Sequence, residues 1–169
     1  MEGKQVSDSR TVMAQTMNPQ DANPAGNVHG GVIMKLIDTV GGAVAVRHAR
    51  SNAVTASLDR LDFHYPLFIG DFVTLRASLN YVGKTSMEIG VRVESENLMT
   101  GERHHIASAY LTFVALDRNN RPIPVPPLIL ETDDEIRRNH EAKARRARRL
   151  AEKTKEKQCQ LDANKCDFS

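Results

Sequence analysis

The feature that most constrains the fold is an alternation of apolar and polar residues between residues 72 and 96. In the first run the apolar positions are Val73, Leu75, Ala77, Leu79 and Tyr81, with polar residues between them. Successive side chains of a β-strand point to opposite faces, so this pattern predicts a strand with one buried face. Residues 87–94 repeat the pattern after a turn signal at Gly83-Lys84. The two runs therefore predict an antiparallel hairpin.

Two further strands are expected on either side of this hairpin, over about residues 54–65 and about residues 105–116. Turn residues at 66–71 and 99–102 separate them from it. Four long consecutive strands with short links predict an antiparallel sheet. Residues 11–17 are expected to add a short strand, followed by a loop rich in Pro, Asn, Asp and Gly.

One apolar helix is predicted from Gly31 to about Ala49. The residues that recur there at helical spacing are Val32, Ile33, Leu36, Ile37, Val40, Ala43 and Val44. One face of the predicted sheet needs cover, and this helix is the only candidate within the domain. The expected fold class is therefore α+β, an antiparallel sheet wrapped around a central helix.

The chain's 169 residues suit one domain with appendages rather than two domains. The P-I-P-V-P-P run from residue 122 cannot continue a sheet, because proline lacks the N–H group and fixes φ. We expect a disordered N-terminus over residues 1–10, the domain over residues 11–130, and a basic C-terminal helix with a polar tail over residues 131–169. Acidic residues begin that helix and basic residues follow, which matches the helix dipole.

The compartment expected is the cytoplasm. No apolar run approaches the length that crosses a bilayer, so no membrane insertion is expected. The polar N-terminus lacks the apolar stretch of a secretory signal. Cys159 and Cys166 lie in the tail and are expected to be unremarkable reduced thiols. No cysteine or histidine cluster suits a metal, so neither a metal nor a cofactor is expected.

The C-terminal helix concentrates the basic charge, with Arg145, Arg146, Arg148 and Arg149 close together. Such a cluster can bind nucleic acid or an acidic membrane surface. Base-stacking aromatic residues are missing from this stretch, and its glutamates dilute the charge. A solvated helix face is the expected explanation, with no nucleic acid partner.

The stretch with chemical content is N-P-A-G-N-V-H-G-G over residues 23–31, followed seven residues later by Asp38. Gly30 and Gly31 fall where the helix begins, where unpaired backbone N–H groups can hold a carbonyl oxygen that gains negative charge. Asp38 lies about two turns further, and Gly41 and Gly42 are expected on its face. Close approach by a ligand or another backbone would explain these glycines. Helix packing and a solvated carboxylate are the alternative.

This stretch resembles the hotdog-fold acyl-CoA thioesterases, in particular the cytosolic long-chain (brain-type) acyl-CoA hydrolases. The resemblance extends through D-F-H-Y-P-L-F-I-G-D, G-K-T-S-M-E-I, S-E-N-L-M-T-G, T-F-V-A-L-D and V-P-P, and it covers most of residues 10–130. It implies a hotdog fold and hydrolysis of medium- to long-chain fatty acyl-CoA to free acid and CoA. A CoA-ester hydratase would need a different Asp/His arrangement.

The resemblance also implies roles for individual residues. Asn23 would orient the water or the thioester, and Asp38 would act as general base or, as the alternative, as nucleophile. The helix start at Gly30 and Gly31 would hold the oxyanion, with His29 shaping the mouth of the site. Asn23 as a turn residue and His29 as a helix cap remain alternatives.

For the CoA phosphates, the resemblance points to Lys84 with Thr85 and Ser86 in the turn between the paired strands. A solvated turn lysine is the alternative for Lys84. Brain-type relatives carry two hotdog units in tandem and divide the site between them, whereas this chain has one unit. It keeps both Asn23 and Asp38, so a symmetric dimer could build two sites, and a trimer of dimers is the implied hexamer. A non-catalytic acyl-CoA-binding regulator is the alternative function.

Overall fold

The structure is a computed structural model that describes residues 1–161, with side chains described through residue 158. Its elements in chain order are β1 (Lys4–Gln5), β2 (Thr11–Thr16), the 3-10 helix η1 (Pro19–Asp21), α1 (Gly30–Ala49), β3 (Asn52–Phe63), β4 (Phe72–Val82), β5 (Ser86–Glu96), β6 (Arg103–Leu116), β7 (Leu128–Ile129) and α2 (Asp133–Leu161). The predicted helix, the hairpin β4–β5 and the strands flanking it are confirmed, with bounds that differ by about two residues. Cys166 and the side chain of Cys159 lie outside the described part.

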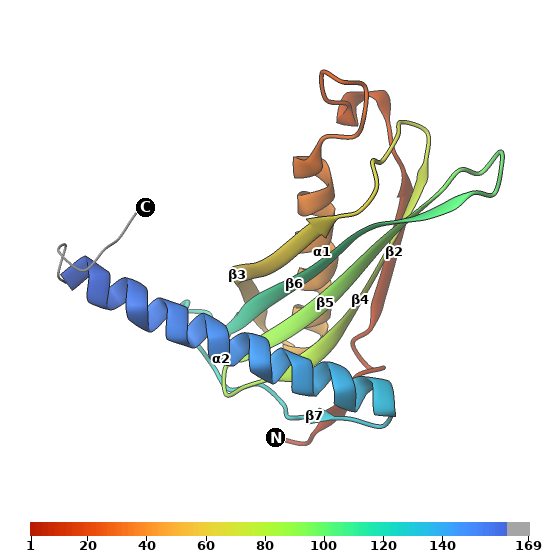
Figure 1. Ribbon diagram of the computed structural model, residues 1–169. Coiled ribbons are helices and arrows are strands. Elements are labelled where there is room, and N and C mark those ends of the chain that lie inside the picture. The colour runs from red at the N-terminus through yellow and green to blue at the C-terminus, as the bar shows by residue number, and fades with distance from the viewer. Residues whose placement is uncertain (162–169) are drawn as a thin grey trace.

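The main sheet has five strands in the order β2-β4-β5-β6-β3, all antiparallel. Strands β3 and β4 follow each other in sequence but are not neighbours, because β3 pairs with β6 at the edge. Figure 1 shows α1 against one face of the sheet, with the strands curving around it. The predicted α+β fold, a sheet wrapped around a central helix, is confirmed.

Gly41 explains how closely α1 approaches the sheet. A Cβ atom at this position would lie 3.0 Å from the ring of Phe113, a buried residue of β6. Gly41 itself is buried on the helix face toward the sheet, whereas Asp38 is exposed on another face. The prediction that Gly41 shares a ligand-facing surface with Asp38 is therefore wrong, and helix packing accounts for this glycine.

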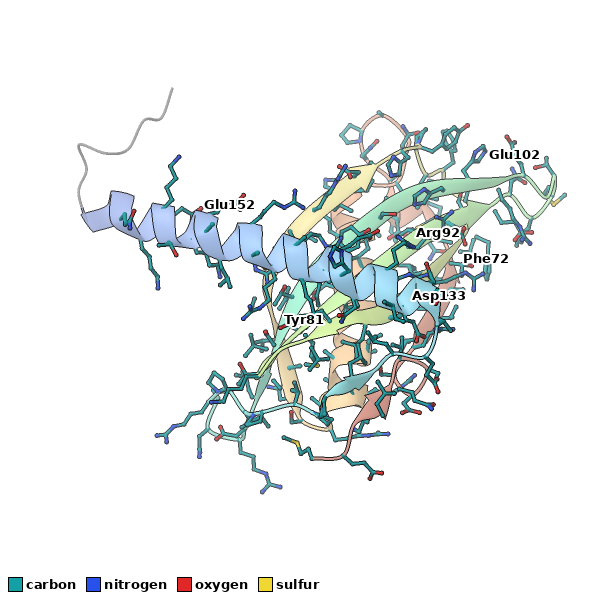
Figure 2. The ribbon with its side chains drawn as sticks, turned by 60° about the horizontal axis from the view of Figure 1, so that its bottom comes forward. Phe72, Tyr81, Arg92, Glu102, Asp133 and Glu152 are labelled. Atoms are coloured by element: carbon teal, nitrogen blue, oxygen red, sulfur yellow. The ribbon has the colours of Figure 1, made fainter. Side chains whose placement is uncertain are left out.

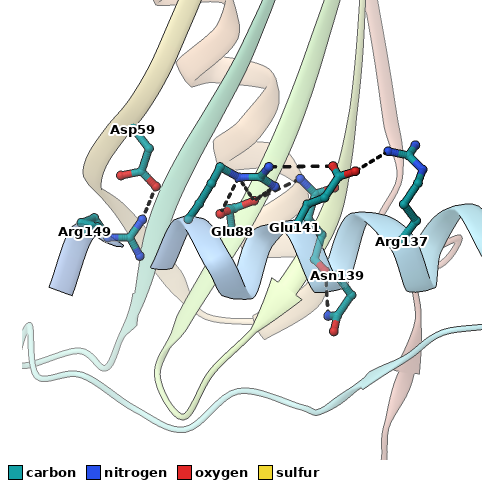
Figure 3. A network of polar contacts seen from close by, with 8 residues as sticks. Asp59, Glu88, Arg137, Asn139, Glu141 and Arg149 are labelled. Carbon is teal, nitrogen blue, oxygen red and sulfur yellow. Dashed lines mark hydrogen bonds and ion pairs between the residues drawn. The ribbon is translucent and has the colours of Figure 1, made fainter. Parts of the chain in front are cut away.

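The second helix, α2, covers part of the opposite face of the sheet. Thr132 and Glu135 cap its start: Thr132 Oγ1 accepts from Glu135 N at 3.2 Å, and Glu135 Oε2 accepts from Thr132 N at 3.3 Å. Asn139 Nδ2 then donates to Asn80 O of β4 at 2.8 Å. Figure 3 shows these contacts continuing along the helix toward Arg149. The first half of this helix therefore packs on the sheet through polar contacts. The sequence predicted a solvated face and did not predict these contacts.

Residues 1–10 differ from the expected disordered segment. Strand β1 pairs in parallel with β7, with Lys4 opposite Leu128, and Val6 is buried. Lys4 Nζ donates to His48 O at 2.6 Å, near the end of α1. The sequence signal was weak because a two-residue strand has no periodicity to detect.

His48 is a fully buried residue of α1 whose ring holds the proline-rich segment. Its Nε2 lies 2.9 Å from Pro126 O and must carry the proton, because a carbonyl oxygen only accepts. Its Nδ1 is buried and has no hydrogen-bond partner among the described residues. Burial lowers the pKa of His48 below its ordinary value of 6.5, since a charged ring would be desolvated there.

We expect His48 to make the fold sensitive to acid. In the unfolded chain the His48 ring takes up a proton near pH 6.5, whereas in the folded chain it is protonated only at a lower pH. This stabilising contribution is complete above the unfolded value and is lost as pH falls toward the lowered folded value. The melting temperature of the wild type should fall more between about pH 7.5 and about pH 5 than that of His48→Gln. His140→Gln, at an exposed position of α2, is the control and should keep the wild-type slope. Equal slopes in all three proteins would contradict the assignment.

No helix in residues 1–161 combines the length and apolar character needed to cross a bilayer.

Candidate active site

The loop before α1 is shaped by Asn23. Its side-chain Oδ1 accepts from Ala25 N at 2.9 Å and from Asn27 N at 3.2 Å, as an asparagine does in a turn. Val28 N donates to Leu67 O at 2.8 Å and ties the loop to the segment before β4. The side-chain amide nitrogen of Asn23 has no hydrogen-bond partner among the described residues, so it can still donate to a bound molecule. The turn role and the predicted substrate role are thus compatible.

His29 caps the start of α1. Its Nδ1 accepts from Gly31 N at 2.9 Å, and its backbone N–H donates to Asp21 O at 2.8 Å. The Gly31 N–H is therefore occupied by the cap, while that of Gly30 makes no hydrogen bond to the residues that the structure describes. Of the two glycines expected to hold an oxyanion, Gly30 offers the available donor.

Asp38 lies about 10 Å along the helix from Gly31, given the rise of 1.5 Å per residue. Thr55 Oγ1 of β3 donates a hydrogen bond to Asp38 Oδ1, and both residues are exposed in the single chain. This bond orients the carboxylate and leaves its second oxygen without a hydrogen-bond partner among the described residues. Strand periodicity could not identify Thr55, because its role depends on how β3 packs beside α1.

Exposed apolar side chains also occur on α1 and β3, the two elements that carry Asp38 and Thr55. Met34, one turn before Asp38, is 44% exposed, and Leu58 and Phe63 of β3 are 40% and 48% exposed. The Phe63 ring also lies near Gly30, 3.7 Å from where a Cβ atom would stand. An exposed apolar strip beside a polar catalytic candidate suits an apolar substrate or a second protein chain.

The structure does not bring all the predicted site residues together within one chain. The Asn23 loop lies at the end of the sheet where β4 begins, since β2 pairs Thr16 with Phe72. The turn that contains Lys84, Thr85 and Ser86 lies at the other end of β4, about 35 Å away along an eleven-residue strand. Gly83 N donates to Ser86 O at 2.7 Å and closes this turn, with the Lys84 side chain exposed. No hydrogen bond links Asn23 to Asp38 in the described part of the chain.

A metal centre has no counterpart among the residues that the structure describes, where no group of three or more His, Cys, Asp or Glu side chains is placed to hold an ion.

Known proteins are similar to this chain in sequence. Residues 25–102 match the family described as the thioesterase superfamily. The chain is 43% identical to the uncharacterized acyl-CoA thioester hydrolase YkhA of Bacillus subtilis, over 76% of this chain and 75% of that protein. It is 40% identical to the cytosolic acyl coenzyme A thioester hydrolase of Rattus norvegicus, over 83% of this chain. It spans only 37% of the length of that rat protein.

Solved structures agree with these relatives. The crystal structure of an apo-hexameric acyl-CoA thioesterase superposes with a TM-score of 0.87 at 38% identity, covering 90% of this chain and 97% of that one. An acyl-CoA hydrolase from Staphylococcus aureus, solved with coenzyme A and with an asparagine replaced by alanine, gives a TM-score of 0.89 at 32% identity. The match covers 98% of this chain and 99% of that one. With a central helix, a five-stranded sheet and these relatives along most of its length, the chain belongs to the hotdog-fold acyl-CoA thioester hydrolases.

Proposed function

We propose that this protein hydrolyses medium- to long-chain fatty acyl-CoA to the free acid and CoA, with Asp38 as general base. The observation that carries the proposal is the Asp38 carboxylate, oriented by Thr55, on elements that also expose apolar side chains. A carboxylate placed so that it can take a proton from water suits thioester hydrolysis, and the apolar strip suits a fatty acyl chain.

The Staphylococcus aureus hydrolase supports this choice of residues. Three of its solved structures carry single alanine substitutions, at an aspartate, an asparagine and a threonine. In that protein the aspartate follows the asparagine by 15 positions, and the threonine follows the aspartate by 17 positions. The same two intervals separate Asn23, Asp38 and Thr55 here.

Each of these groups has a separate role in the proposed reaction. Water attacks the thioester carbonyl carbon while Asp38 takes one of its protons, and the carbonyl oxygen becomes an oxyanion. The Gly30 N–H and the positive end of the α1 dipole stabilise that charge, and the Asn23 amide orients the thioester. Collapse of the tetrahedral intermediate breaks the carbon–sulfur bond, and the leaving CoA thiolate takes the proton from Asp38, which restores the base. His29 holds the helix start and borders the site.

We further propose that each site is divided between two chains, with Asn23 from one and Asp38 from the other. Within one chain the two side chains are not in contact, and the Asp38 surface of α1 and β3 is exposed and partly apolar. A symmetric dimer that covers this surface would create two equivalent sites. A trimer of such dimers is the proposed assembly, in keeping with the hexameric relative.

The turn of Lys84, Thr85 and Ser86 is proposed to bind the CoA phosphates. A lysine and two hydroxyls supply the cation and donors that phosphates require. Because the turn is remote from the chain's own Asn23 loop, it would serve a site to which another chain contributes that loop. The proposed compartment is the cytoplasm, in keeping with the name of the rat relative.

The proposed activity is tested by following thiol release from a panel of acyl-CoAs of increasing length. The purified protein should release CoA from octanoyl- or palmitoyl-CoA, and EDTA should leave the rate unchanged. Binding of acyl-CoA without turnover at every length would instead support the alternative of a non-catalytic acyl-CoA-binding regulator.

The same assay separates phosphate binding from chemistry. Lys84→Ala should raise KM for acyl-CoA several-fold, by roughly the 1 to 2 kcal/mol of a charge-assisted contact, with little change in kcat. The loss should be much smaller on an acyl-pantetheine thioester, which lacks the nucleotide phosphates. Equal losses on both substrates would contradict the phosphate role.

A further inference from the structure

Arg146 of α2 is a half-buried arginine that forms no ion pair with any side chain that the structure describes. Its neighbours Arg145 and Arg149 each pair with a carboxylate of the sheet. Arg148 also has no ion pair in the described part of the chain, but it is exposed to solvent. A cation that has lost part of its hydration gains more from an anion than an exposed one does. Arg146 is therefore the arginine of this cluster best suited to bind an anionic ligand.

Arg146 lies over the ring of Tyr81, near the end of β4. Its guanidinium carbon is 5.8 Å from the centroid of that ring, and Figure 2 places Tyr81 beside α2. The same ring borders the turn between β4 and β5, because a Cβ atom at Gly83 would lie 3.5 Å from Tyr81 Cε1. The Tyr81 ring therefore connects Arg146 with the turn that is proposed to bind the CoA phosphates.

The backbone of this turn is held by hydrogen bonds from β6 and from the segment that follows it. Ala115 N donates to Thr85 O at 3.0 Å, and Val125 N donates to Lys84 O at 3.1 Å. The turn and Arg146 are thus fixed on the same part of the sheet. A ligand that contacts both would pay little conformational entropy for ordering the backbone.

Two lysines of α2 lie on the side of the helix that carries Arg146. Helical spacing sets Lys143 about 60° and Lys153 about 20° from Arg146 around the helix axis. Both lysines are exposed, and neither forms an ion pair with the residues that the structure describes. A row of cations of this kind attracts a polyanion and raises its rate of association.

The acidic residues near Arg146 lie on another side of the helix or are already paired. Glu141 and Glu152 are about 140° and about 120° from Arg146 around the axis, and Glu156 is about 15 Å further along it. Glu141 is engaged by another arginine of α2 at 2.7 Å. Glu88 of β5 is buried in a separate ion pair. An anion at Arg146 would therefore meet little repulsion.

We propose that Arg146 binds the 3′-phosphate of the CoA moiety, while the turn of Lys84 binds its diphosphate. The inference rests on the phosphate role of that turn in the proposed function and adds a residue of α2 to it. CoA carries a diphosphate and, on its ribose, a separate phosphate monoester. The planar guanidinium can donate two parallel hydrogen bonds to the free oxygens of a monoester, whereas a lysine acts as a point charge.

Thioesters that differ only in the 3′-phosphate test the assignment. Arg146→Gln should raise KM for acyl-CoA about tenfold with kcat unchanged. On acyl-dephospho-CoA, which lacks the 3′-phosphate, this variant and the wild type should have the same KM. Lys84→Ala should raise KM on both thioesters, because both keep the diphosphate. Arg146→Lys should recover part of the loss, since it keeps the charge and lacks the planar fork.

The matched control is Arg148→Gln, which removes the same charge from the opposite side of α2 and should leave every KM unchanged. Equal increases for Arg146→Gln on acyl-CoA and acyl-dephospho-CoA, or no increase on either, would overturn the 3′-phosphate role and leave the proposed hydrolysis intact. Calorimetric titration with CoA and with dephospho-CoA gives the same comparison without turnover. A wild type that binds neither would overturn both the phosphate contacts and the proposed function.

Discussion

Asp38→Ala should reduce kcat for acyl-CoA hydrolysis by about a thousandfold, the range expected for loss of a general base. KM should change little, because Asp38 takes a proton in the transition state and contributes little to ground-state binding. Thr55→Val, which removes only the hydroxyl that orients the carboxylate, should lower kcat by about tenfold. Thiol release at saturating acyl-CoA measures both effects.

The control is Asp133→Asn, which changes an exposed carboxylate in the first turn of α2 and should leave kcat unchanged. Circular dichroism should show that all three variants keep the fold. An Asp38→Ala protein with near wild-type kcat would exclude Asp38 as the base.

Arg145→Met should lower the free energy of unfolding by about 3–5 kcal/mol, because it leaves a carboxylate buried without its counter-ion. Arg145 Nη2 lies 2.7 Å from Glu88 Oε1, and the two side chains are only 12% and 2% exposed. The guanidinium also lies 3.8 Å above the Tyr110 ring, and Asn80 Nδ2 donates to Glu88 at 3.2 Å. Figure 3 shows Glu88 beside α2. The melting temperature should fall by about 10 °C at equal protein concentration.

Replacing both partners distinguishes a buried charge from lost packing. Arg145→Met combined with Glu88→Gln should recover much of the stability, since no unpaired charge is then buried. Arg137→Met removes exposed ion pairs to Asp134 and Glu141 and should change little. A double variant no more stable than Arg145→Met alone would show that the loss comes from packing.

The order and approximate bounds of the main elements could be predicted because they follow from local periodicity. The alternation over β4 and β5 and the 3.6-residue repeat over α1 depend only on which face each residue buries. The pairing of β3 with β6 rather than β4 could not be read this way, because strand order is a property of the whole sheet. The pairing of β1 with β7 was missed for the same reason.

The candidate site follows the same rule: features set by local sequence could be predicted, and those set by packing could not. Asn23 and Asp38 could be proposed as site residues because they belong to one stretch that is contiguous or close in sequence. Thr55 could not, since its hydroxyl reaches Asp38 only through the packing of β3 beside α1. Glu88 reads as a solvent-facing strand residue, and only the return of α2 across the sheet buries it. Which face of α1 packs on the sheet could likewise not be read from the sequence, because it depends on the contact between Gly41 and Phe113.

The divided site is tested most directly by mixing two inactive proteins, Asn23→Ala and Asp38→Ala, after unfolding and refolding them together. Random pairing makes about half of the dimers mixed, and each mixed dimer would hold one doubly substituted site and one wild-type site. Activity should therefore return to about a quarter of the wild-type value. If Asn23 and Asp38 of the same chain form each site, every site in the mixture carries a substitution. No return of activity, in a sample that native mass spectrometry shows to contain mixed dimers, would contradict a site built from two chains.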